Sequence, residues 1–139
     1  MYLDSIIANE SLVDAMKVYK AVHVVDGNEF LYGVYREHYP GEHDPMIGWI
    51  PRGEKLIKLG AINTAEIFIM GQGGVEYNSG FHCSTNLESA LRYIKYHHWY
   101  GAVVLHYIIP PETTVLYGRQ DGDTVVITPT LSNPRASAQ

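Results

Sequence analysis

The residues best suited to chemistry lie in one short segment, residues 81–86, which reads Phe-His-Cys-Ser-Thr-Asn. It combines an aromatic ring, an imidazole, a thiol, two hydroxyl groups and an amide directly ahead of a predicted helix. The free N–H groups and the positive dipole end at a helix N-terminus favour an anionic or carbonyl-rich ligand. The same residue types also cap helices, so a structural interpretation stands beside the functional one. We predict that the ligand-binding side chains of this segment are Phe81, His82, Ser84, Thr85 and Asn86.

Cys83 is the single cysteine of the chain. Nucleophilic catalysis by its thiol needs a nearby base, but the neighbouring His82 would point to the opposite face of a strand. We therefore interpret Cys83 as a small core residue and assign no catalytic residue. A single cysteine also excludes an internal disulfide and a zinc site built from several cysteines. Together with the lack of a secretory signal pattern, it leads us to expect a cytoplasmic protein.

Seven histidines raise the question of a metal site. His38 and His43 have acidic neighbours, but their spacing matches no metal-binding motif, and the Pro-Gly pair between them would fix little. We interpret this stretch as a solvated acidic loop and predict neither a metal site nor a cofactor. The sequence also lacks a glycine-rich phosphate loop of the Gly-x4-Gly-Lys-Ser/Thr type.

The composition limits the class of partner. Of the 139 residues, 46% are hydrophobic and 18% charged, and the formal net charge is −5. An acidic chain with scattered basic residues matches nucleic-acid polymers poorly, because these need clustered cations. The apolar runs are too short to span a membrane. The 11 tyrosines favour half-buried walls and wet interfaces, since each combines apolar area with a hydroxyl group.

Two helices and several strands are expected to position these side chains. A rough apolar stripe predicts an N-terminal helix over residues 4–16. Thr85 and Glu88 have the spacing of a capping box at the start of a second helix. The side chains that this second helix is expected to bury are Leu87, Ala90, Leu91 and Ile94.

The strands are predicted from runs of β-branched and aromatic residues bounded by turn residues. They comprise a first hairpin over residues 18–25 and 30–35, a short strand within 46–50, a nearly continuous apolar strand over 102–109 at the sheet centre, and a second hairpin over 113–117 and 124–128. We predict one α+β domain with a twisted, mainly antiparallel sheet of about six strands and two helices. The sheet and main helix span residues 18–128, and residues 130–139 form a loose tail.

The first predicted strand has two distinct faces. Tyr19, Ala21 and His23 share one face, while Lys20 and Val22 share the other. A histidine on such a face is either a satisfied structural residue or part of a site, and the sequence leaves both interpretations open.

The order of these elements resembles the ADP-ribosyltransferase-like group in its small phage and bacterial members. The likeness covers residues 18 to about 128. It rests on the first strand, on the Gly-Phe-His-Cys-Ser-Thr segment that enters a helix reading Leu-Glu-Ser-Ala-Leu, and on the strand over 102–109 with the Pro-containing turn that follows.

The resemblance implies a cleft between the first strand and residues 81–85. In it, His23 would hold the ribose of a cofactor, and Ser84 and Thr85 would provide the hydroxyl groups beside it. Tyr93 or Tyr96 would stack on a ring.

The family's catalytic glutamate would lie on a late strand, near residues 124–128, which read Thr-Val-Val-Ile-Thr and contain no carboxylate. Asp123 and Glu112 are the nearest substitutes. ADP-ribosyl transfer needs a carboxylate to stabilise an oxocarbenium-like transition state, so losing it removes catalysis more readily than binding.

These observations lead us to expect a protein that binds or sequesters an ADP-ribose-like or cyclic nucleotide, as a homo-oligomer. Small phage proteins that sequester nucleotide signals of anti-phage defence provide the functional analogy. The phosphate would be held by an arginine, for which the candidates are Arg36, Arg92 and Arg119. A divergent ADP-ribosyltransferase or related NAD-consuming enzyme, and a protein–protein inhibitor with a tyrosine-rich interface, are the alternatives.

Overall fold

The structure of the chain is a computed structural model. It describes residues 3–25, 28–30, 42–44, 48–50, 56–58, 62–65, 69–72, 75–78, 80–96 and 102–132. The elements in these ranges are β1 (Ser5–Ser11), β2 (Met16–Val25), β3 (Asn28–Phe30), β4 (Glu42–Asp44), β5 (Gly48–Ile50), β6 (Leu56–Lys58), β7 (Ile62–Thr64), β8 (Ile69–Gln72), β9 (Val75–Asn78), β10 (Phe81–Ser84), α1 (Leu87–Tyr96), β11 (Val103–Ile109), β12 (Thr114–Gln120), β13 (Asp123–Thr128) and β14 (Thr130–Ser132).

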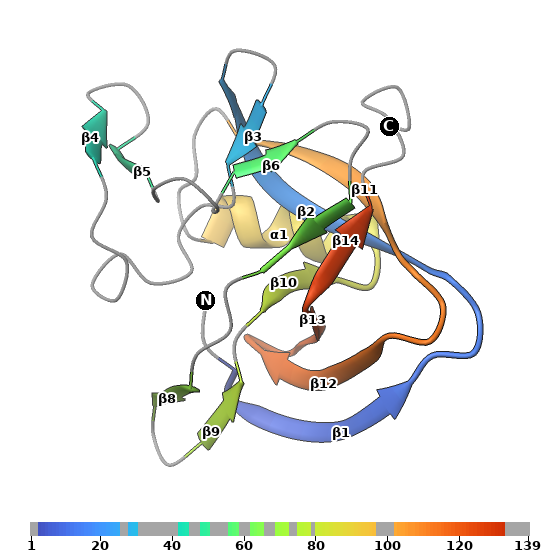
Figure 1. Cartoon of the computed structure of the whole chain (residues 1–139). Coiled ribbons are helices and arrows are strands. Elements are labelled where there is room, and N and C mark those ends of the chain that lie inside the picture. Colours follow the sequence, from blue (N-terminus) through green and yellow to red (C-terminus); the bar gives the residue numbers. More distant parts are fainter. Residues whose placement is uncertain are drawn as a thin grey trace.

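An antiparallel sheet dominates the described part of the chain. Its strands follow the order β1-β12-β13-β10-β2-β11-β14-β7, and β3 and β6 extend it from the far end of β2. Figure 1 shows β1 and β12 side by side, curving together along one margin. The hairpins β4–β5 and β8–β9 form two small separate sheets. A mainly antiparallel sheet with a helix is consistent with the predicted α+β class, but the sheet path has eight strands where about six were expected.

The predicted helix over residues 4–16 is wrong, because this segment forms β1 and the start of β2. β1 pairs with β12, from Ser5 opposite Arg119 to Ser11 opposite Thr114. The apolar stripe is too weak to anchor a helix, since Val13 is 85% exposed. Pairing along a whole neighbouring strand satisfies the backbone and overrides a weak helical pattern. Among the described residues, α1 is the single helix.

The second predicted hairpin is present, and the first is shown only in part, because Asn28, expected in its turn, belongs to the partner strand. β2 pairs with β3, with Val25 opposite Asn28, although residues 31–35 of the predicted hairpin lie outside the described residues. β12 pairs with β13 through a two-residue turn, Asp121 and Gly122, whose φ angles are 52° and 83°. Two positive φ angles define the turn type whose twist matches paired strands, and glycine adopts that conformation without strain.

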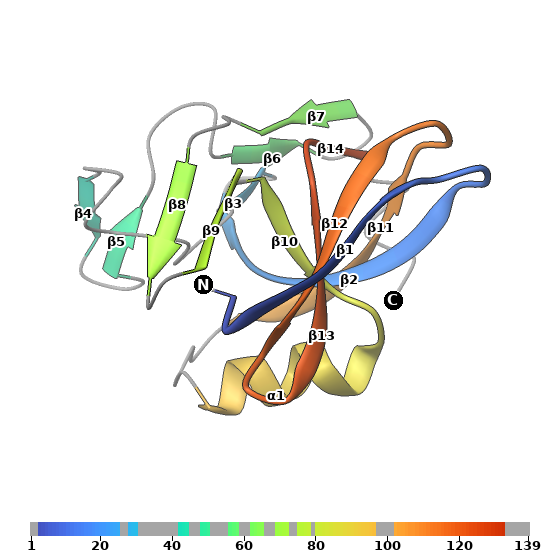
Figure 2. The ribbon, with the colours of Figure 1, turned by 90° about the horizontal axis from the view of Figure 1, so that it is seen from below.

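The strand predicted at the sheet centre, β11, lies between β2 and β14. Alternation along β2 separates the two faces of the sheet, as predicted. Val18 and Val22 are fully buried in the main apolar core, while Ala21, on the other face, packs against Tyr93 and Ile94 of α1. Figure 2 shows α1 lying along this one side of the sheet. The helix and the strand ends beneath it therefore form the walls of any site on this face.

The prediction of a loose tail over residues 130–139 is wrong for its first three residues. β14 occupies the start of the segment expected to be loose, and it pairs with both β11 and β7. Its central residue, Leu131, is fully buried in the core, which explains why this polar segment is ordered. Residues 133–139 lie outside the described residues. No helix in the described ranges has the length and apolar character needed to cross a membrane.

Candidate functional site

The helix α1 begins at a different cap from the predicted one. The Ser89 backbone N–H donates to the Asn86 side-chain oxygen over 2.8 Å, so Asn86 is the N-cap. The N-cap is therefore one residue later than predicted, and the predicted capping box of Thr85 and Glu88 is wrong. Glu88 instead lies 3.9 Å from Arg92, one helical turn further along, and both side chains are exposed.

The helix also turns a different face to the sheet. Ala90 is buried and Ile94 is half-buried, as predicted. Leu87 and Leu91, however, are 46% and 50% exposed, so their predicted burial is wrong. Ser89 and Tyr93 lie nearer the sheet instead. This rotation directs a polar and aromatic stripe of α1 towards the β12–β13 hairpin.

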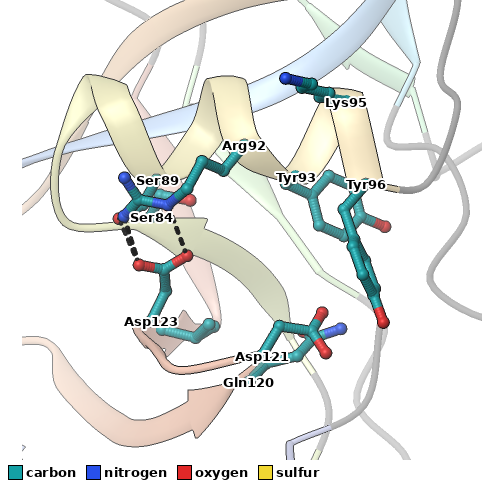
Figure 3. Close-up of a pocket in the computed structure, with 10 residues that line it drawn as sticks. Ser84, Ser89, Arg92, Tyr93, Lys95, Tyr96, Gln120, Asp121 and Asp123 are labelled. Carbon is teal, nitrogen blue, oxygen red and sulfur yellow. Dashed lines mark hydrogen bonds and ion pairs between the residues drawn. The ribbon is translucent and has the colours of Figure 1, made fainter.

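A cavity of about 730 Å³ lies between α1 and the end of this hairpin, and we call it the α1 cavity (Figure 3). Its lining residues are Ser84, Ser89, Arg92, Tyr93, Lys95, Tyr96, Gln120, Asp121, Asp123 and Val125. In Figure 3, the rings of Tyr93 and Tyr96 project from the helix on the side of Gln120 and Asp121, and the Lys95 amine points away from them.

The strand register explains why these residues meet. Ser84 of β10 is paired with Val125 of β13, and Gln120 of β12 is paired with Asp123. Directly opposed residues of antiparallel strands point to the same face. Residues two apart on a strand also share a face, which adds Asp123 to the face of Val125. The strand side of the cavity is therefore set by backbone pairing.

The end of the hairpin is tied to the N-terminal segment. The Asp121 backbone N–H donates to the Asp4 carboxylate over 2.8 Å, and the Asp4 backbone N–H donates to the Arg119 carbonyl over 2.7 Å. Together with the tight two-residue turn, these bonds fix the end of the β12–β13 hairpin, which forms the cavity wall that faces α1.

An ion pair spans the cavity from the helix to the hairpin. Arg92 donates through Nε and Nη2 to the two carboxylate oxygens of Asp123, and Nη2 also donates to the Ser89 hydroxyl over 3.1 Å. The Ser89 hydroxyl in turn donates to Asp123 over 3.1 Å. The hydrogen bond from Arg92 lowers the pKa of Asp123, and the same bond raises the pKa of Arg92. Both groups are thus charged at neutral pH and largely neutralise each other.

Gln120 is the unusual member of the lining. It is 9% exposed, and its side-chain oxygen Oε1 is buried with no hydrogen-bond partner among the described residues. Buried polar atoms are nearly always paired in folded proteins, because an unpaired one loses its hydration without compensation. Gln120 therefore carries a desolvation cost that no described residue compensates.

A second polar cluster lies at the other end of β10, and its groups are paired with one another. The Leu3 backbone N–H donates to the Tyr77 hydroxyl over 3.1 Å, and this hydroxyl lies 3.2 Å from His82 Nε2. His82 Nδ1 lies 3.1 Å from the Gly80 carbonyl, which only accepts, so Nδ1 carries the proton. Nε2 then accepts from Tyr77. We call these four residues the His82 cluster.

Burial keeps the His82 ring in its neutral form. Desolvation, with smaller electrostatic contributions, holds the pKa of His82 well below its ordinary value, so the ring is neutral. Gly80 allows β10 to begin here, since a Cβ on Gly80 would lie 2.7 Å from the Thr128 carbonyl oxygen. His82 therefore serves to join strands in the core.

Lys20 extends the His82 cluster with a buried charge. Its ammonium donates to the His82 carbonyl over 2.6 Å, and the residue is 5% exposed. Desolvation lowers the pKa of Lys20 from 10.5 to about 8. The neighbouring Cys83 thiol is also buried, and desolvation raises its pKa from 9.0 to about 11, so it is protonated and unreactive at neutral pH. The interpretation of Cys83 as a core residue agrees with its place in the main cluster.

The α1 cavity brings together three of the predicted ligand-binding residues, Ser84, Arg92 and Tyr93, as well as Tyr96. Asp123, one of the two nearest substitutes for the family's glutamate, lies in the same lining. Glu112 lies elsewhere, in the turn between β11 and β12, where its backbone N–H donates to the Leu12 carbonyl.

The other predicted residues lie apart from the α1 cavity. Phe81 and His82 are in the core, each 1% exposed, and Thr85 and Asn86 form the start of α1. Arg119 neighbours Gln120 on β12 and is therefore directed to the opposite face, where it donates to the Gly122 carbonyl. The His23 backbone belongs to β2, but its side chain lies outside the described part of the chain, as does the whole of Arg36.

Sequence reasoning missed several lining residues, chiefly Gln120, Asp121, Ser89 and Lys95. Two signals in the sequence point to them. Ser89, Tyr93 and Tyr96 recur at helical spacing, as a polar stripe beside the apolar one. The Asp-Gly pair at 121–122 is a strong turn signal, and it places residues 120 and 123 opposite each other.

Within the described residues, no group of three or more histidine, cysteine, aspartate or glutamate side chains is arranged to hold a metal ion. His38 lies outside these residues, and so does the side chain of His43. No protein-family model, curated protein or solved structure matches the chain. The resemblance to ADP-ribosyltransferase-like domains therefore stays a prediction.

Proposed function

We propose that this protein binds a small nucleotide-type molecule in the α1 cavity and holds it without converting it. The observation that carries this proposal is a cavity of about 730 Å³ whose lining combines two tyrosines with Arg92. A nucleotide supplies both complements, a flat ring for the tyrosines and a phosphate for the arginine.

The size and walls of the cavity support a ligand of this class. Small-molecule sites usually have volumes of about 300–1,000 Å³, with mostly apolar walls and a few polar groups that fix orientation. The cavity volume of about 730 Å³ lies within that range. Tyr93 is half-buried and Tyr96 is 65% exposed, so the pair presents aromatic surface from within the cavity out to its rim. Stacking of a base on such rings is tolerant of base identity.

A phosphate would be placed near the helix. Two of the Arg92 nitrogens are occupied by Asp123 and Ser89, while its Nη1 atom faces the exposed Glu88 at 3.9 Å. An exposed pair of this kind is weak, so an anionic group competes readily with Glu88 for Nη1. Lys95, in the last turn of the helix, also belongs to the lining, but its amine points away from the two tyrosine rings. This arrangement favours one phosphate at the rim over a long polyphosphate.

The ion pair favours binding over turnover. A carboxylate that stabilises an oxocarbenium-like transition state must offer uncompensated negative charge. Asp123, one of the two nearest substitutes for the family's glutamate, belongs to the cavity lining, but Arg92 donates to both of its oxygens. This supports sequestration, the role expected from the functional analogy, rather than ADP-ribosyl transfer.

Thermal unfolding with a panel of nucleotides, including ADP-ribose and cyclic nucleotides, tests the proposal. The variant Tyr96→Ala removes an exposed ring from the cavity, and Leu91→Ala removes an exposed apolar side chain from α1 outside the cavity. We expect at least one nucleotide to raise the melting temperature of the wild type and of Leu91→Ala, and to lose most of this effect in Tyr96→Ala. The bound compound should be recovered intact by mass spectrometry.

Two results would overturn the proposal. If no member of the panel shifts the melting temperature, the protein does not bind a nucleotide. If NAD or the bound nucleotide is consumed on long incubation, and Asp123→Asn abolishes that consumption, the protein is an enzyme.

A further inference from the structure

The outward side of α1 carries apolar side chains that the fold leaves uncovered. Leu87 and Leu91 are 46% and 50% exposed, and because they are four residues apart they form one row along the helix. The sheet is already covered by other residues of α1, namely Ala90 and Ile94. In Figure 2, the helix lies at a margin of the molecule. A row of exposed leucines at such a place is typical of a surface that contacts a partner.

Two opposite charges flank this row. Glu88 and Lys95 are seven residues apart, which places them on the same face of the helix and about 10 Å apart along its axis. The Glu88 side chain is 87% exposed, and it lies 3.9 Å from Arg92. Lys95 is exposed and forms no ion pair with any described residue. This face is therefore negative near the beginning of the helix and positive near its end.

The third charge of the helix is compensated from within the molecule. Arg92 donates through Nε and Nη2 to the two carboxylate oxygens of Asp123, on the cavity side of α1. In Figure 3, the Arg92 guanidinium lies against Asp123, whereas the Lys95 amine points away from the cavity tyrosines. The charges that α1 offers to a partner are therefore those of Glu88 and Lys95.

We propose that two copies of this chain associate through α1, with the two helices packed antiparallel and Glu88 of each copy paired with the partner's Lys95. The midpoint between residues 88 and 95 lies beside Leu91, so a two-fold axis at this point brings Leu91 against the partner's Leu91. A parallel arrangement would place like charges opposite each other. The antiparallel one also sets the two helix dipoles in opposite directions, which is favourable. The contact is self-complementary, so it closes at a dimer, and it does not depend on the proposed function.

The size of the surface sets the strength to expect. α1 has 10 residues and is therefore about 15 Å long, which is short for a protein interface. We expect weak association, with a dissociation constant between about 10 μM and 1 mM. Sedimentation velocity of the full chain over this concentration range should show a reversible equilibrium between monomer and dimer.

Exchanging the two charges tests the pairing directly. Glu88→Lys and Lys95→Glu each replace both ion pairs of the dimer by like-charged pairs, so each should weaken self-association by about tenfold or more. The double variant restores opposite charges and should associate within about threefold of the wild type. A mixture of the two single variants should form a mixed dimer, because its lysines then face glutamates at both pairs.

One control variant and one further variant separate this surface from general charge effects. Glu10→Lys makes the same change of charge at an exposed position of β1, three strands from β10 in the sheet order, and should keep the wild-type association. Leu91→Ala removes apolar contact at the two-fold axis and should weaken association by about fivefold or more. Circular dichroism checks that each variant is folded.

Three results would overturn the proposal. The first is a wild type that stays monomeric up to about 1 mM, the weak limit of the expected range. The second is a dimer that is unchanged in Lys95→Glu, or single variants that do not associate when mixed. The third is assembly beyond a dimer. If Glu88→Lys does not fold, Lys95→Glu together with its double variant still decides between these outcomes.

Discussion

Two groups of polar residues meet the short strand β10, one at each end. They differ in whether all of their buried polar atoms have hydrogen-bond partners. In the His82 cluster, each ring nitrogen of His82 and the Tyr77 hydroxyl has a partner within the protein. Beside the α1 cavity, which Ser84 joins from the other end of β10, the amide oxygen of Gln120 has no partner among the described residues. A buried polar network that is fully satisfied specifies a fold, whereas an incomplete one carries an uncompensated desolvation cost.

Their surroundings explain the difference. The His82 cluster is enclosed by the core, so an unpaired group there would have no compensation from water or ligand. The α1 cavity lies beneath a helix at the end of a hairpin, where space of about 730 Å³ remains. Substitutions should therefore affect stability strongly in the first region and weakly in the second, while ligand binding should follow the opposite order.

The largest effect is expected for His82→Ala. It removes a buried ring and leaves the Tyr77 hydroxyl and the Gly80 carbonyl unpaired, so the free energy of unfolding should fall by about 3 kcal/mol. Urea denaturation followed by circular dichroism measures this change. A loss below about 1 kcal/mol would contradict the structural role of the cluster, since a single net hydrogen bond contributes that much.

The next largest effect is a dependence of the free energy of unfolding on pH, caused by the buried Lys20 and Cys83. The pKa of Lys20 is about 8 in the folded protein and 10.5 when exposed, so above pH 8 the unfolded state holds more protons and stability rises with pH. The pKa of Cys83 is about 11 when folded and 9.0 when exposed, so above pH 9 this thiol lowers stability as pH rises. The free energy of unfolding should rise by about 1 kcal/mol between pH 7.5 and pH 9 and then level off.

Urea unfolding at a series of pH values checks this profile in the wild type and two variants. Lys20→Met should abolish the rise, and Cys83→Ala should extend it beyond pH 9. A wild-type profile that falls steadily from pH 7.5 would show that the Lys20 ammonium is not desolvated as its position indicates.

A smaller effect of opposite sign is expected for Gln120→Met in the absence of ligand. Replacing an unpaired buried acceptor by an apolar group of similar shape removes an uncompensated desolvation cost, so stability should be unchanged or rise by up to about 1 kcal/mol. Chemical denaturation of the ligand-free variant measures it. If the variant loses more than about 1 kcal/mol, the amide makes a stabilising interaction and the contrast between the two regions disappears.

The smallest effect is expected for Asp123→Asn. The Arg92–Asp123 pair lies at the surface, with the Arg92 side chain 55% exposed, and exposed ion pairs contribute little in water. The free energy of unfolding, measured by urea denaturation, should fall by less than about 0.5 kcal/mol. A loss as large as that of His82→Ala would show that the pair is a structural element rather than part of an adaptable cavity wall.

The sequence predicted the strands whose patterns are local. β2 alternates between two faces, and β12 and β13 meet at an Asp-Gly turn, so their residues alone identify them. β1 was missed because its strand state depends on pairing with β12, which lies more than a hundred residues further along the chain. Such long-range pairing leaves little trace in a local apolar pattern.

The candidate site was predicted in part for the same reason. Ser84, Arg92 and Tyr93 lie in or next to the segment that the sequence identified, and they meet in the cavity. Gln120 was missed because its place in the lining depends on how α1 packs on the sheet, with Leu87 and Leu91 turned outward. The apolar stripe of α1 and its polar, aromatic stripe recur at the same helical spacing. Only packing decides which of the two stripes faces the sheet.

The two bonds of Asp4 have a consequence for the order of events during synthesis. The Asp4 carboxylate accepts from Asp121, 117 residues further along, so the cavity wall is completed only after both segments have left the ribosome. A nascent chain that already contains α1 still lacks the hairpin that faces it. The α1 cavity therefore exists only in molecules whose sheet is complete, and partly folded chains lack the site proposed for the ligand.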